Sequence, residues 1–147
     1  MRRREFIAGV GSAAALPLIA GAQQLGRLRR IGVLMPYAEN DPESNRRFST
    51  FTKALVDLGW TEGHNVRVDL RSGIGTDRMR GLAHELVGLQ PDVILTGETP
   101  ATAALQRETQ TIPVVFVTAV DPVASGIVPR LDRPSGNFTA LVSWNPA

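Results

Sequence analysis

The sequence contains no cysteine, one tyrosine and few aromatic residues of any kind. Without cysteine the chain can form no disulfide, no thiolate metal site and no lipid anchor on an N-terminal cysteine. Its two histidines, His64 and His84, show no metal-ligand spacing. Nucleotide and hydrolase signatures are also missing: there is no Walker loop and no Gly-x-Ser-x-Gly elbow, and Gly73-Ile74-Gly75 lacks the third glycine of a dinucleotide fingerprint. We therefore expect no catalytic site, metal or cofactor.

The chain has little excess charge, with 16 basic and 14 acidic residues. Three of the basic residues, Arg2, Arg3 and Arg4, and one acidic residue, Glu5, lie in the first 22 positions. The remaining chain carries 13 residues of each sign. A neutral chain offers no broad positive surface for a phosphate backbone, so we expect no nucleic acid partner.

Residues 1–22 have the three parts of an export signal. Arg2-Arg3-Arg4 is the charged region, residues 7–20 are apolar, and Ala20-Gly21-Ala22 is a small-x-small cleavage site. The charged region resembles a twin-arginine motif without its usual lysine, so the general secretory route stays open. A membrane helix is the alternative, but the apolar run is shorter than the roughly 20 residues of a span. We expect cleavage after Ala22 and a periplasmic chain that is not an integral membrane protein.

Strand-like and helix-like segments alternate through residues 23–147. Apolar runs at residues 31–35, 93–95 and 114–117 predict buried strands. Alternating residues 66–70 predict a half-buried edge strand, and residues 138–142 a short last strand. Helices are expected to begin near residues 41, 76, 99 and 121. We therefore predict an α/β fold with an open parallel sheet of order 2-1-3-4-5 and helices on both faces, forming one domain.

The first predicted helix carries signals at both of its ends. Asp41 is a good cap, Pro42 suits the first helical position, and Gly59 suits the left-handed position after the last turn. The apolar stripe of this helix is expected at Phe48, Phe51, Leu55 and Leu58.

Three predicted strand ends lead into a capping residue followed by proline: Asp41-Pro42, Thr99-Pro100 and Asp121-Pro122. In a parallel sheet these strand ends share one rim, where ligands of open α/β sheets bind. Helix N-termini offer free N–H groups and partial positive charge, which favour a carboxylate or phosphate. A cap followed by proline is also ordinary helix initiation, so only the threefold occurrence favours a binding edge.

The ligand-binding candidates are residues that follow the buried strands: Tyr37, Gly97, Glu98, Thr99, Thr118 and Asp121. Tyr37 can stack on a ligand or close a cleft, or only pack on the surface. Gly97 permits close approach to the backbone, and Glu98 suits an ammonium group or is a solvated charge. Asp121 either contacts the ligand or only caps the helix that is expected to follow it. Ser72-Gly73, after the edge strand, is a weaker candidate.

The order of several short segments resembles ABC substrate-binding proteins of the tryptophan/tyrosine type. These segments are residues 3–7, 30–34, 58–63 (Leu-Gly-Trp-Thr-Glu-Gly), 91–95 (Pro-Asp-Val-Ile-Leu), 112–116 (Ile-Pro-Val-Val-Phe), 121–123 (Asp-Pro-Val) and 134–139 (Pro-Ser-Gly-Asn-Phe-Thr). They extend over nearly the whole chain. The resemblance implies a type I periplasmic-binding fold whose two lobes close on an aromatic or other amino acid. It also implies an ABC permease as partner.

The family's contacts come from loops after the strands, which agrees with Tyr37, Glu98, Thr99, Thr118 and Asp121 as ligand contacts. Family members have two lobes and about twice this length, so we expect residues 23–147 to be an N-terminal lobe, with the second lobe missing and apolar surface exposed. A repressor would need a helix-turn-helix where the export signal lies, and no nucleophile–base pair supports an enzyme. A periplasmic domain that presents its ligand to a receptor remains an open alternative.

Overall fold

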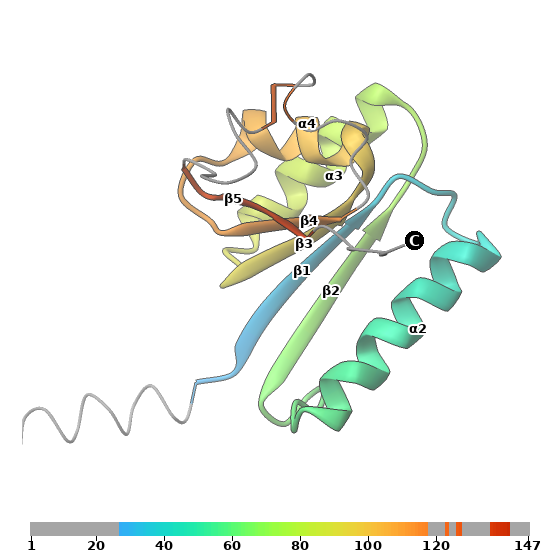
Figure 1. Ribbon diagram of the computed structural model, residues 1–147, viewed down its shortest axis with the longest axis vertical. Coiled ribbons are helices and arrows are strands. Elements are labelled where there is room, and N and C mark those ends of the chain that lie inside the picture. The colour runs from blue at the N-terminus through green and yellow to red at the C-terminus, as the bar shows by residue number, and fades with distance from the viewer. Residues whose placement is uncertain (1–26, 118–122, 124–125, 128–135, 142–147) are drawn as a thin grey trace, which may run out of the picture.

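The computed structural model describes residues 27–117, 123, 126–127 and 136–141. Strands and helices alternate along most of this part of the chain (Figure 1). The elements are β1 (Arg29–Met35), α2 (Pro42–Asp57), β2 (Val66–Ser72), α3 (Thr76–Gly88), β3 (Val93–Gly97), α4 (Glu98–Glu108), β4 (Val114–Val117) and β5 (Phe138–Leu141). The helix predicted from Asp121 to about Leu131 lies outside the described residues.

The five strands form one parallel sheet in the order β2-β1-β3-β4-β5, which confirms the predicted fold class. The strand with alternating polarity, β2, lies at an edge as expected. The apolar strands β1 and β3 lie inside, where neighbours on both sides satisfy their backbone groups. Because β1 and β3 are parallel neighbours, their carboxyl ends meet on the same rim.

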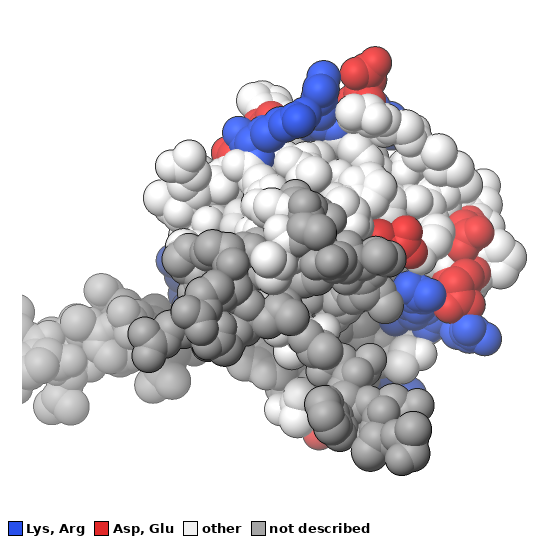
Figure 2. All heavy atoms as spheres, turned by 45° about the horizontal axis from the view of Figure 1, so that its top comes forward, with Lys and Arg blue, Asp and Glu red and all other residues white. Residues whose placement is uncertain are grey.

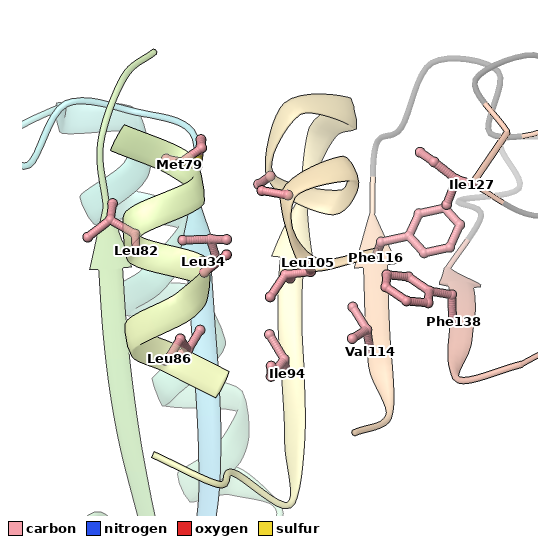
Figure 3. Packing of buried hydrophobic residues seen from close by; sticks show 13 residues of the cluster. Leu34, Met79, Leu82, Leu86, Ile94, Leu105, Val114, Phe116, Ile127 and Phe138 are labelled. Carbon is pink, nitrogen blue, oxygen red and sulfur yellow. The ribbon is translucent and has the colours of Figure 1, made fainter. Parts of the chain in front are cut away.

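The helices divide unequally between the two faces of the sheet. Among the described residues, helices α3 and α4 lie together over one face, and α2 lies over the other (Figure 1). The core fills the space between the sheet and the α3–α4 pair (Figure 3). Its fully buried side chains include Leu34, Leu86, Ile94, Leu105 and Phe116. Helix α3 contributes Met79, Leu82, Ala83 and Leu86 to this core, and all four are buried.

Helix α2 has the predicted ends and a weaker apolar face than predicted. The Asp41 side chain accepts a hydrogen bond of 2.8 Å from the Ser44 N–H, with Pro42 in the first turn. Gly59 follows the helix with φ +89°, as its left-handed position requires. Phe48, Phe51 and Leu55 are half-buried, but Leu58 is 76% exposed. The prediction for Leu58 was wrong because this residue is the C-cap, which follows the last helical residue, Asp57.

The part of the chain that the structure describes contains no helix both long and apolar enough to cross a membrane.

Candidate functional site

The rim where β1 and β3 end carries the starts of α2 and α4. Two of the three predicted helix N-termini therefore lie on one edge. The third, Asp121-Pro122, lies outside the described residues, as does Thr118 at the end of β4. Free N–H groups of two helices face this edge, which makes it favourable for a negatively charged group.

Tyr37 and Glu98 meet across this rim. Tyr37 follows β1, Glu98 follows β3, and the Tyr37 hydroxyl donates a short hydrogen bond to Glu98 Oε1. Both side chains are half-buried. The hydrogen bond to Glu98, together with partial burial, raises the pKa of Tyr37 above its ordinary value. The sequence placed both residues on the rim without indicating that they touch.

The start of α4 differs from the prediction. The helix begins at Glu98 with Gly97 in the N-cap position and no side-chain cap, so Thr99 is not the cap. The reason is that β3 runs directly into the helix through Glu98, which adopts φ +63°. Gly97 is buried and Thr99 is half-buried at the rim. Pro100 lies inside the first turn, where its missing N–H costs no helical hydrogen bond.

Three charged residues of α2 that were not predicted as site residues extend the site. The Arg47 guanidinium lies 5.6 Å from the centre of the Tyr37 ring, within cation–π range. Arg47 Nε also donates to Glu43 Oε1 at 2.8 Å, and Arg46 pairs with the other Glu43 oxygen. Hydrogen bonds from Arg47 and Arg46 lower the pKa of Glu43. The spacing of Glu43 to Arg46 and Arg47 in the first turns of a predicted helix was the available signal.

A groove of about 520 Å³ lies between α2 and the sheet. Its lining includes the polar side chains of Glu43, Arg46, Arg47 and Thr50 together with Gly97, and the apolar side chains of Met35, Phe51, Ala54, Leu95, Val117 and Leu141. Apolar walls with a few converging polar groups are typical of small-molecule sites. The arrangement suits a ligand with one apolar end and one or two charged groups.

Ser72, at the end of β2, supports the site without belonging to it. Its hydroxyl donates to the Tyr37 carbonyl oxygen at 2.8 Å and so fixes the loop that carries Tyr37. The neighbouring N–H of Gly73 donates to the Met35 carbonyl at 3.2 Å. Ser72-Gly73, the weaker candidate from the sequence, therefore positions the segment from Met35 to Tyr37.

On the face drawn in Figure 2, basic side chains lie next to acidic ones and do not merge into one positive area. Ion pairs among the described residues include Arg78 with Glu39 at 3.3 Å. Such pairs balance charge locally.

A family model described as ABC transporter substrate binding protein matches residues 31–147. A tyrosine-binding protein of Clostridioides difficile is 30% identical over 104 residues, which are 70% of this chain and 30% of the relative. The family match covers both the sheet and the rim.

Two solved structures show a similar fold. A conserved domain protein from Vibrio cholerae aligns with a TM-score of 0.73 and 28% identity, over 82% of this chain and 40% of that one. The ABC domain in complex with L-Trp from Streptococcus pneumonia aligns with a TM-score of 0.70 and 23% identity, over 78% of this chain and 38% of that one. The chain thus spans between about a third and two fifths of the length of these relatives.

Proposed function

The chain belongs to the ABC transporter substrate binding protein family, and from this premise we propose that it is a ligand-binding lobe that captures a small organic molecule for an ABC importer. The ligand class that we propose is an aromatic or other amino acid. This choice is supported by the C. difficile relative, which is described as tyrosine-binding. A substrate-binding protein releases its ligand unaltered, so the proposal includes no enzymatic activity.

The observation that carries the proposal is the meeting of Tyr37, Glu98 and Arg47 at the rim, next to an apolar groove that Arg47 and Gly97 also line. Glu98 offers carboxylate oxygens to an ammonium group. Arg47, Arg46 and the helix N-termini favour a carboxylate, which Arg can hold by two parallel hydrogen bonds. An apolar side chain would lie over Met35, Leu95 and Val117. Thr99, Thr118 and Asp121 complete the proposed contacts.

The proposal extends to export and to a partner. Residues 1–22 would be removed after Ala22, leaving residues 23–147 as a periplasmic lobe that delivers its ligand to an inner-membrane permease. A second lobe opposite the rim would close over the ligand by a hinge motion, as two-domain binding proteins do. The ratio of this chain's length to that of its relatives supports such a two-lobed arrangement.

The site is tested by measuring amino-acid binding to the chain and to two variants by calorimetry. Tyr37→Ala removes the aromatic ring at the rim, and Thr99→Ala removes a hydroxyl in the first turn of α4, next to Glu98. We expect both to weaken binding of L-tyrosine, because Thr99→Ala loses a ligand hydrogen bond and Tyr37→Ala loses the whole ring contact, which outweighs the loss of its hydroxyl. Circular dichroism should show an unchanged fold. Thr61→Ala, an exposed threonine distant in sequence, is the matched control.

Unchanged affinity in both variants would show that the ligand binds elsewhere. Recovery of L-tyrosine in altered form after incubation with the chain would contradict the assignment as a binding protein.

A further inference from the structure

The hydroxyl of Tyr37 occupies an oxygen of Glu98 in the structure. Glu98 is paired with the Tyr37 hydroxyl, whereas Glu43 pairs with both Arg46 and Arg47. A ligand ammonium group that approaches the rim therefore meets a carboxylate with one oxygen already in use.

Three contacts hold Tyr37 and Glu98 in this arrangement. Ser72 fixes the backbone of Tyr37 through a hydrogen bond of 2.8 Å, and Arg47 lies over its ring. Thr102 donates to the carbonyl oxygen of Glu98 at 2.7 Å. Glu98 itself has φ +63°, a conformation that is costly for a residue with a side chain and persists only where the surroundings enforce it. The pair is therefore built into the fold.

The charged side chains around Tyr37 keep its hydroxyl protonated, so that it can donate a hydrogen bond. Glu98 of α4 and Glu43 of α2 raise the pKa of Tyr37, and Arg47 of α2 opposes them. The phenol is accordingly protonated at neutral pH and can serve Glu98 as an internal hydrogen-bond partner.

Given the proposed binding function, on which this step rests, we propose that Tyr37 sets the affinity of the site for ligands with an ammonium group by competing for Glu98. In the empty site its hydroxyl holds the carboxylate oxygen. A ligand with an ammonium group forms the stronger charge-assisted contact and displaces the hydroxyl, whereas a ligand without one cannot. Tyr37 thereby weakens the binding of cationic amines and sets the affinity at which they bind.

The test compares the unaltered chain with Tyr37→Phe, which keeps the ring and removes only the hydroxyl. The probes are L-phenylalanine and phenylpropanoate, which differ by the ammonium group alone. Titrations are followed by NMR chemical shifts of the labelled protein, which also report weak binding. We expect Tyr37→Phe to bind L-phenylalanine about tenfold more tightly, since one competing hydrogen bond is removed, and phenylpropanoate with unchanged affinity.

Unchanged or weaker binding of L-phenylalanine by Tyr37→Phe, with normal binding by the unaltered chain, overturns this inference and leaves the proposed function intact. Failure of the unaltered chain to bind either probe or L-tyrosine overturns both.

A ligand-free measurement tests the pair itself. Tyr37 is the sole tyrosine, so the ultraviolet absorbance of its phenolate reports its ionisation without interference from other phenols. We expect the pKa of Tyr37 to fall in Glu98→Gln, because the negative charge that raises it is removed. An unchanged pKa in this variant would overturn the inference.

Discussion

Asp69 on β2 keeps its charge in a nearly buried position, with its side chain 11% exposed. Arg30 on the neighbouring strand β1 donates from Nε at 2.6 Å, and Arg67 lies at 3.5 Å. The hydrogen bond from Arg30 is the main reason why the pKa of Asp69 is lowered. The Arg30–Asp69 pair links the neighbouring strands β1 and β2. We therefore expect the charge of Asp69 to contribute to the stability of the sheet.

Asp69→Asn should lower the stability of the chain at neutral pH and have little effect in acid. A carboxyl whose pKa is depressed by folding stabilises the protein above its unfolded pKa of about 3.9, and this contribution disappears as pH falls through the folded pKa. Urea unfolding at pH 7 should separate the variant from the unaltered chain, and the two should converge as the pH falls through the lowered pKa of Asp69. Asp77→Asn is the control: the Asp77 side chain is 99% exposed, so this substitution should leave the stability unchanged at both neutral and acidic pH.

At the scale of elements, α2 and α3 are held very differently. Four residues of α3 are buried in the core, whereas Ser44 is the buried residue of α2. Amides open by local unfolding at a free energy that reflects such packing. We expect backbone amides of α2 to exchange with deuterium much faster than those of α3, as measured by mass spectrometry. Equal protection would show that the α2 side of the sheet is more tightly packed than its burial indicates.

Two glycines on these helices should respond to alanine in opposite directions. Gly59 ends α2 at φ +89°, where a Cβ is disfavoured, so Gly59→Ala should destabilise the chain by about 1 kcal/mol. Gly81 lies exposed within α3 with open space around it, so Gly81→Ala should stabilise by about 0.5–1 kcal/mol. Urea denaturation measures both changes. Shifts of the same sign would contradict the backbone explanation.

The sequence predicted strands and their order well because that information is local. Apolar runs such as 114–117 and the alternation of β2 specify burial directly. It predicted the start of α4 less well, since the left-handed Glu98 follows from how β3 enters the helix. Likewise, sequence placed Tyr37 and Glu98 on one rim, but their hydrogen bond and the approach of Arg47 depend on side-chain directions. Such contacts between distant segments have no signature in local pattern.

At the scale of the whole molecule, the connections explain why one face of the sheet is poorly covered. Right-handed crossovers place the helix between β1 and β2 on one face and those from β2 to β3 and from β3 to β4 on the other. Among the described residues, α2 is therefore the sole helix on its face (Figure 1). Alternate side chains show the result: Ile94 and Phe116 are buried, whereas Leu95 and Val117 are half-exposed.

This open face should bind an apolar dye, and a charge placed on it should reduce that binding. Leu141 on β5 is 57% exposed and lines the groove with Leu95 and Val117. In Leu141→Lys, we expect the fluorescence of bound ANS to fall while stability changes by less than about 0.5 kcal/mol, because the position is at the surface. Ile74→Lys is the matched control, since Ile74 is 69% exposed in the loop before α3, outside the groove. An equal fall in both variants would mean that the dye responds to added charge in general, and the groove on the α2 side would then not be the exposed apolar surface of the molecule.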